Sequence, residues 1–313
     1  MVVKEPATAK AGQIALAKDA SADQAVAVVF ARCLKQWTAN EAVALSGLNP
    51  EGVHEMRVAL RRMRVALSDF KEIIPVGQVH WLKRESKWLI SSLSAARDWD
   101  VFLFELLTPV EASRAGDVGL AELRLAAEAE RQTGYVVVRG AIRSTRYSAL
   151  SARLTRWLSG KSWRKAGHGR QKALDESAEK LAGRLLTKRH KAVLKLGRDF
   201  NKFSPEERHQ LRIALKKLRY TAEFFRSLYR KKRETAYFHA LAQLQDSLGR
   251  MNDIAVADHL LERLSAVRKD RRASDHLQTA IGLVSGWHAH SAITSETEAE
   301  SNWREFCGCD AFW

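Results

Sequence analysis

A basic segment occurs twice in this chain of 313 residues, at a constant offset of 155 residues. The first copy covers residues 50–70 and reads PEGVHEMRVALRRMRVALSDF, and the second covers residues 205–225 and reads PEERHQLRIALKKLRYTAEFF. A weaker match continues at the same offset, where residues 91–100 align with residues 246–255. Because no gap separates these landmarks, the sequence indicates duplication of one helical unit.

Each copy has the periodicity of an amphipathic helix. At about 100° per residue, the basic positions fall within a stripe about 80° wide, and the apolar positions occupy the opposite side. The two stripes consist of His54, Arg57, Arg61 and Arg64 in the first copy, and His209, Arg212, Lys216 and Arg219 in the second. We find no acidic residue at i+4 within the stripes, so we expect cationic faces that are not neutralised by ordinary surface salt bridges.

The beginning of each repeated helix is also marked. Pro50 and Pro205 suit the first helical turn, and Ser204 with Glu207 has the spacing of a capping box. Long helices with few interruptions are predicted elsewhere in the chain, which contains only 5 prolines. In the second half, separate helices are expected over residues 234–249 and 252–270.

A second basic stripe precedes the second copy, and it includes Arg184, Lys188, Lys191 and Lys195. These side chains lie within about 80° of one another on a helical wheel. Their counterparts in the first half, 155 residues earlier, are not basic, so the two halves are chemically unequal. A lysine-rich stripe is equally typical of a solvated helix face, and the spacing leaves both interpretations open.

The charge of the chain indicates a polyanionic partner. There are 52 Lys and Arg residues against 36 Asp and Glu residues, which gives a formal net charge of +16. Residues 139–233 hold 28 of the basic residues and only 7 of the acidic ones, so the field is strongly uneven. Membrane binding is not expected, because no apolar stretch is long enough to span a bilayer and no basic helix has a large bulky-apolar face.

The repeated pattern H-x-x-R-x-x-L-[RK]-[RK]-x-R resembles the CHAD family, α-helical domains named for their conserved histidines. Further stretches carry the same resemblance, namely SAARDWDVF, SARLTRWL, LQDSLGRMND and the final AFW. It covers about residues 14–313. The resemblance implies an all-α bundle of two pseudo-two-fold-related halves, whose basic central cavity binds inorganic polyphosphate, and an association with polyphosphate granules and granule proteins.

The chemistry of the stripes suits a chain of phosphates. Arginine offers a planar fork for bidentate contacts, and lysine acts as a mobile point charge. Residues at i, i+3, i+7 and i+10 span about 15 Å of helix, and a histidine at the helix start lies where the dipole favours an anion. The expected polyphosphate-binding residues are His54, Arg57, Arg61, Arg62, Arg64, His209, Arg212, Lys216, Lys217, Arg219, Arg184, Lys188, Lys191 and Lys195.

Three alternatives are weighed against this hypothesis. An enzyme is not expected, because the chain has no P-loop, no G-x-S-x-G and no H-E-x-x-H, and neither a catalytic residue nor a cofactor is predicted. Metal binding by the repeated histidines is disfavoured, because the neighbouring arginines would repel a cation. Nucleic acid, or a nucleotide phosphate, could bind the same positive field, but aromatic platforms beside the basic residues are scarce, so nucleic acid is expected only as a weaker competitor.

We therefore predict residues 1–13 to be disordered and residues 14–313 to form one all-α domain. Its halves are expected at about residues 14–158 and 172–313, joined by a basic linker at about 159–171. The three cysteines give no disulfide framework, and the N-terminus lacks the apolar core of a signal peptide. A reducing, cytoplasmic setting is the simplest expectation.

Overall fold

The computed structural model describes residues 7–165, 170–269 and 275–313. It confirms the all-α class, with 83% of the chain helical and no strand among the described residues. The helices of the first half are α1 (Ala22–Ala39), α2 (Glu41–Ser46), α3 (Glu51–Asp69), α4 (Val76–Ser92), α5 (Ser94–Val101), η1 (Phe102–Leu107), α6 (Thr108–Ser113), α7 (Val118–Ile142) and α8 (Thr145–Ser159). Those that follow are η2 (Ser162–Lys165), α9 (Gln171–Asp175), α10 (Ala178–Leu196), η4 (Phe200–Lys202), α11 (Pro205–Phe225), η5 (Arg226–Leu228), α12 (Lys231–Lys269) and α13 (Asp275–Cys307).

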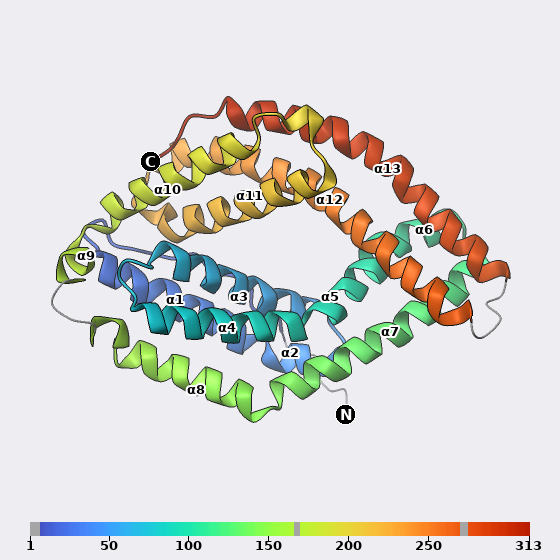
Figure 1. Ribbon diagram of the computed structural model, residues 1–313, viewed down its shortest axis with the longest axis horizontal. Helices are drawn as coiled ribbons and strands as arrows, with labels where there is room; N and C mark the ends of the chain where they lie inside the picture. The colour runs from blue at the N-terminus through green and yellow to red at the C-terminus, as the bar shows by residue number, and fades with distance from the viewer. Residues whose placement is uncertain (1–6, 166–169, 270–274) are drawn as a thin grey trace.

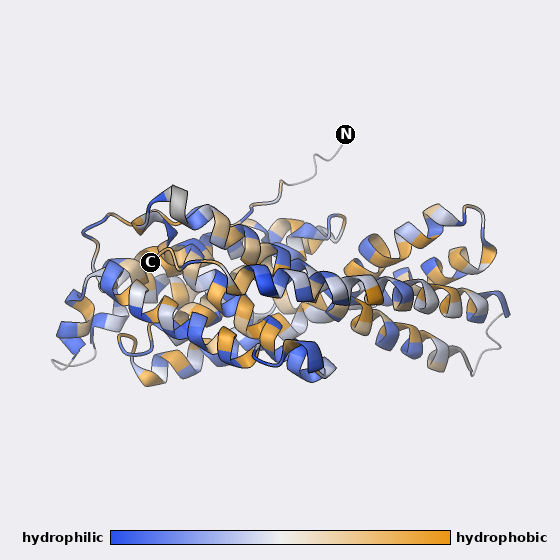
Figure 2. Cartoon of the chain, turned by 90° about the horizontal axis from the view of Figure 1, so that it is seen from above, coloured by the Kyte–Doolittle hydropathy of each residue, from blue (hydrophilic) through white to orange (hydrophobic). Residues whose placement is uncertain are grey.

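The molecule is elongated, with a broad body and a narrower helical extension (Figures 1 and 2). The body contains α1–α4 and α8–α11. Its core is one cluster of buried side chains, whose first member along the chain is Ile14 and whose last is Phe312. A smaller second core lies in the extension, where η1, α6 and α7 pack against the later parts of α12 and the first turns of α13. Each core thus draws residues from both halves of the sequence. None of the described helices is long and apolar enough to cross a membrane.

The repeated segments form α3 and α11, which contact each other in the middle of the body (Figure 1). Their apolar faces are buried as the wheel predicted, with Met56, Leu60, Leu211 and Leu215 each 0% exposed. The capping box at the start of α11 is confirmed: the Ser204 N–H donates to Glu207 Oε2 over 2.8 Å, and the Glu207 N–H donates to Ser204 Oγ over 3.3 Å.

One predicted helix break is absent. The helices expected at 234–249 and 252–270 are one continuous helix, α12. The glycine at the expected break, Gly249, costs only about 1 kcal/mol inside a helix, and no proline interrupts the chain there. In the first half, Leu93, which is the counterpart of Leu248, does separate α4 from α5. The duplicated units therefore differ in helix continuity.

The chain before α1 is held by specific contacts over residues 7–13, which the composition had predicted to be disordered. The Ala9 N–H donates to Asn40 Oδ1 over 3.0 Å, and Asn40 Nδ2 donates to the Ala9 carbonyl over 2.8 Å. Arg32 Nη2 donates to the Gln13 carbonyl over 3.1 Å. Side-chain amides and guanidinium groups thus replace the missing helical hydrogen bonds of this segment. Residues 1–6 lie outside the described residues.

The predicted linker also packs in part against the body. Trp163 is 1% exposed, and its Nε1 donates to Asp23 Oδ1 over 2.7 Å. Arg164 Nε donates to the same oxygen over 2.8 Å, so the segment is tied to α1. Residues 166–169 of the predicted linker lie outside the described residues. All three cysteines are free, in agreement with the absence of a predicted disulfide framework.

A buried ionic network fixes α5 against α7. Asp100 is 0% exposed and accepts a hydrogen bond from Arg131 Nε over 2.7 Å and another from the Tyr135 hydroxyl over 2.9 Å. Arg131 Nη2 also donates to the Gly47 carbonyl over 2.7 Å, which connects the network to the loop before α3. Because α5 carries Arg97 and Asp98 toward α3, this network positions part of the site described below.

The Asp100 network predicts a large stability effect. Asp100→Ala leaves the Arg131 charge buried without its carboxylate, so we expect the free energy of unfolding in urea to fall by about 3–5 kcal/mol. The control is Glu300→Ala, which removes an exposed partner of Arg304 and should change stability by less than about 1 kcal/mol. Equal losses in the two variants would contradict a structural role for the network.

Candidate anion-binding cavity

A cavity of about 1230 Å³ lies between α3, α5, α11 and α12, with residues 10–14 along one side. This volume is larger than that of a typical small-ligand pocket, which is about 300–1,000 Å³. Ten Lys or Arg side chains and seven Asp or Glu side chains line it. The lining cations are Lys10, Arg57, Arg61, Arg62, Arg97, Arg212, Lys216, Arg219, Arg226 and Arg250.

Cations from α3, α5 and α11 meet in the central part of the cavity. Arg57 is fixed at the junction of α4 and α5, because its Nη1 donates to the Ile90 carbonyl over 3.1 Å and to Ser94 Oγ over 2.5 Å. Arg212 lies 3.8 Å from a carboxylate oxygen of Asp253. The centre is thus built from side chains whose positions are fixed by neighbouring helices.

Three buried guanidinium donors in this centre have no hydrogen-bond partner among the described residues. They are the Nε atoms of Arg57, Arg61 and Arg212. An unpaired donor in a buried position costs about 1–3 kcal/mol, and more when the group is charged. These Nε atoms are closed to the open space of the cavity, so an anion there would be bound by the charge and the remaining N–H groups of the three guanidiniums.

Like charges and burial together disfavour protonation in the cavity. Burial, followed by the positive charges of Arg212 and Arg61, lowers the pKa of Lys216 to about 7. Burial and the charge of Arg61 lower the pKa of Arg57 to about 10. The pKa of Arg212 is also lowered, again mainly by burial. An anion would reverse this repulsion, so the site is electrostatically complementary to negative charge.

Asp98 and Asp253, which occupy equivalent positions 155 residues apart, both line the cavity beside the cations. Burial raises the pKa of Asp98, although the charges of Arg57 and Arg97 oppose this rise. Asp253 lies beside Arg212. Both aspartates stand within helices, α5 and α12, and not at helix caps. Two carboxylates orient this centre without cancelling its positive charge.

The two repeated histidines occupy different environments. His54 lines the cavity, and burial together with the charges of Arg97, Arg61 and Arg57 lowers its pKa to about 4. His209 is exposed and does not line the cavity; its Nδ1 lies 3.2 Å from Asn252 Oδ1. The sequence equivalence of the two histidines therefore does not extend to their positions.

Glu223 partly neutralises the cations on one side of the cavity, which corrects one sequence argument. Glu223 lies four residues after Arg219, and it accepts a hydrogen bond from Arg219 Nε over 2.9 Å and a second one from Arg62. The stripe on α11 thus does contain an acid at i+4. Arg62 is 5% exposed and packs against the Phe224 ring, 5.4 Å from its centroid. Arg62 and Arg219 line the cavity, but both are already paired.

Six further residues of the predicted set lie outside the cavity lining. Arg64 donates from Nη1 to the Lys83 carbonyl over 2.6 Å, and Lys217 is exposed on α11. The α10 stripe faces outward, where Arg184 donates to Glu176 over 2.7 Å and 3.0 Å. The fully exposed members of that stripe are Lys188, Lys191 and Lys195. For α10, the alternative of a solvated helix face describes the observed position.

Sequence reasoning missed four cations of the lining. Arg97 precedes Asp98 in the repeated segment and could have been noticed there, whereas its counterpart in the second half is Asn252. Lys10 and Arg226 lie in segments without a repeat signal, and Arg250 pairs with Glu298 on α13. The arrangement of these groups depends on contacts between distant parts of the chain.

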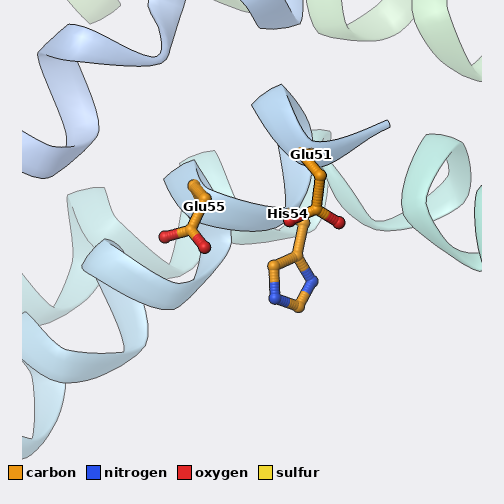
Figure 3. Close-up of side chains that lie close together, drawn as sticks. All are labelled: Glu51, His54 and Glu55. Carbon is orange, nitrogen blue, oxygen red and sulfur yellow. The ribbon is translucent and has the colours of Figure 1, made fainter. Parts of the chain in front are cut away.

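Sequence reasoning also missed a possible metal-ligand cluster at the start of α3. There, Glu51 lies one helical turn before His54. Ligand atoms of Glu51, His54 and Glu55 all lie within 4.8 Å of one another (Figure 3). The Glu55 carboxylate accepts a hydrogen bond from Gln36 Nε2 over 2.6 Å. Arginines 57, 61 and 97 surround the histidine, and the charges that lower its pKa would also repel a metal cation.

The tryptophans provide few free platforms for nucleic-acid bases. Trp37 and Trp99 are 0% and 1% exposed and pack between helices. Trp81 is covered by Arg153, whose guanidinium carbon lies 4.0 Å from the ring centroid. Trp88 is covered in the same way by Arg146, at 4.3 Å. Tyr220 is the aromatic residue of α11 that lines the cavity.

Comparison with known proteins identifies the class. The model of the CHAD domain family matches residues 28–262, so the chain belongs to the CHAD domain family. The crystal structure of the CHAD domain from the plant Ricinus communis is similar, with a TM-score of 0.82 and 29% identity over 97% of this chain and 98% of that one. PptA from Streptomyces chartreusis shares the fold, with a TM-score of 0.68 and 13% identity over 91% of this chain and 100% of that one. Comparison with curated proteins gives no significant match.

Lys216 should make stability depend on pH. In the folded protein its pKa is about 7, against an ordinary 10.5, because burial and then the charges of Arg212 and Arg61 disfavour the protonated form, with Asp253 opposing them. The cost of burying the charged Lys216 therefore lowers the free energy of unfolding in full below pH 7. This cost disappears as the pH rises toward 10.5. Lys216→Met should therefore stabilise the protein more at pH 6 than at pH 9, by about 1 kcal/mol or more.

Urea unfolding at the two pH values measures this difference, and Lys195→Met on the exposed face of α10 is the control. If the stability gain of Lys216→Met is equal at pH 6 and pH 9, the burial of a charged Lys216 does not destabilise the folded protein.

Proposed function

We propose that this protein binds inorganic polyphosphate in the cavity between α3, α5, α11 and α12, without transforming it. The observation that carries the proposal is the convergence of Arg57 and Arg61 of α3 with Arg212 and Lys216 of α11 in one cavity, where their like charges repel one another. Polyphosphate offers only oxygen acceptors and carries a negative charge on each unit, so it matches both the hydrogen bonding and the charge of this centre.

The shape of the cavity supports a chain-like ligand. Cationic side chains approach from α3 on one side and from α11 on the other, so a thin chain between them is contacted from both helices. Arg57 and Arg61 are one helical turn apart, as are Arg212 and Lys216, which spaces each pair by about 6 Å along its helix. Successive phosphate groups can therefore be contacted by successive side chains.

Binding of a polyanion is expected to raise the pKa of Lys216, which burial and the neighbouring cations lower. A polyanion beside Lys216 adds the negative charge that its neighbours lack, so binding is expected to restore the protonated form and to take up a proton near pH 8. The carboxylates at the centre, Asp98 and Asp253, are engaged with arginines. In this proposal they orient the binding groups and do not act as catalysts.

The family membership is consistent with the proposal, since the resemblance that implies polyphosphate binding rests on the same α3 and α11 motifs that line the cavity. We further propose a cytoplasmic location at polyphosphate granules, with granule proteins as neighbours. The model places a single group of three metal-ligating side chains among the described residues, and arginines surround it. Metal binding is therefore not our proposal.

Paired charge reversals test the site. Arg57→Glu with Arg61→Glu, and separately Arg212→Glu with Lys216→Glu, should each weaken the binding of long-chain polyphosphate at least tenfold, which is about 1.4 kcal/mol. Each change removes a phosphate contact and adds repulsion. Isothermal titration measures the affinity, and circular dichroism checks that each variant is helical.

The matched control is Lys161→Glu with Lys165→Glu, which changes the net charge equally in the exposed segment after α8. If this control weakens binding as much as the cavity variants do, then total charge governs binding and the assignment to the cavity is wrong.

Competition distinguishes polyphosphate from nucleic acid. A duplex, whose major groove alone is about 12 Å wide, is too broad to enter a cavity lined by two helices, whereas a single phosphate chain can enter. Long-chain polyphosphate should therefore displace bound duplex DNA at equal phosphate concentration, with poor displacement in the reverse direction. If duplex DNA competes equally well, polyphosphate binds to a generic basic surface and not in the cavity. Salt must be held constant throughout, because both ligands bind with strong salt dependence.

A further inference from the structure

The cationic stripe on α3 continues beyond the cavity. Arg64 lies one turn after Arg61 on the same face of α3, but it does not line the cavity. Its Nη1 donates to the Lys83 carbonyl of α4 over 2.6 Å. This contact directs the end of the stripe toward the junction of α3 with α4, α10 and α11.

Four helices bring cations together at that junction. We call Arg64 of α3, Lys83 of α4, Arg189 of α10 and Lys217 of α11 the outer cluster. Burial lowers the pKa of Lys83, and the charges of Arg64, Lys71, Arg189 and Lys217 lower it further. The pKa of Lys217 is lowered by burial and then by the charges of Arg189 and Arg64. The members are thus close enough to repel one another.

The acids near the outer cluster are already engaged. Asp69 accepts hydrogen bonds from Arg189 Nη2 and from the Thr221 hydroxyl, each over 2.6 Å. Glu72 lies 3.6 Å from Arg184. Among the described residues, no ion pair involves Arg64, Lys83 or Lys217 (the salt bridges found there all have other partners). These three cations therefore lack a carboxylate.

At the corresponding end of the α11 stripe, the cations are paired with a carboxylate. There, Glu223 pairs with both Arg219 and Arg62. The residue 155 positions before Glu223 is Ser68, so the α3 copy has a hydroxyl in place of the acid. That hydroxyl donates to the Arg64 carbonyl over 3.1 Å and adds no charge. One carboxylate thus accompanies two cations at this end of the stripes, whereas Arg64 in the α3 copy has none.

We propose that the outer cluster is a second subsite for condensed phosphate, and that a long polyphosphate chain leaves the cavity along α3 to reach it. The inference rests on the proposed function of the cavity. From Arg57 to Arg64 the stripe rises about 10 Å along the helix, so one chain can contact both subsites. The second contact then becomes intramolecular, and only long chains gain from it.

The test places the missing acid in the α3 copy. Ser68→Glu puts a carboxylate four residues after Arg64, as Glu223 stands after Arg219. We expect this variant to lower the affinity for long-chain polyphosphate about tenfold and to leave the affinity for tripolyphosphate within about twofold, because the short ligand occupies only the cavity. Ser148→Glu, at an exposed position of α8, is the control and should leave both affinities unchanged.

Lys83→Ala with Lys217→Ala gives a second measurement that does not depend on how Ser68→Glu folds, and it should lower the affinity for long chains alone. The proposal is overturned if both variants bind long-chain polyphosphate as the Ser148→Glu protein does. Arg57→Glu with Arg61→Glu separates the two ideas. If that variant binds long chains normally, the assignment of binding to the cavity is wrong. If it loses affinity while the outer-cluster variants do not, the cavity is the binding site and the outer cluster is not a subsite.

Discussion

Repulsion among half-buried cations is the interaction on which this protein's proposed function depends. Packing of α3 against α11 brings Arg61 beside Arg212 and Lys216, and burial removes the water that would screen them. Such an arrangement is unfavourable by itself, as the pKa of about 7 for Lys216 shows. The two large apolar cores hold it in place, and an anion turns the same repulsion into binding energy.

The duplication supplies the two cationic helices, and the differences between the copies give the cavity a direction. Glu223 closes one end of the paired stripes by neutralising Arg219, while Ser68 leaves Arg64 without a carboxylate at the other end. The same inequality appears in the histidines, since His54 faces the cavity and His209 faces solvent. The two ends of the paired stripes therefore differ, because one carboxylate accompanies Arg62 and Arg219 whereas Arg64 has none.

Much of the fold was predictable because helical periodicity is a local property. The buried faces of α3 and α11, the capping box at Ser204 and the all-α class follow from spacing alone. The uninterrupted α12 was not predicted, because the packing of its flanks outweighs the small local cost of Gly249. The order of residues 7–13 was missed for a similar reason, since distant Asn40 and Arg32 supply the hydrogen bonds.

For the site, the sequence by itself determined which residues are cationic and that they lie on one face of each repeated helix. Only the tertiary structure decided which of them meet. Arg57, Arg61, Arg212 and Lys216 line one cavity, whereas the lysines of α10 face outward. Arg97 also lines the cavity, although it belongs to neither of the two repeated stripes. A helical wheel gives the direction of a side chain relative to its own axis, and the neighbour in that direction depends on how distant helices pack.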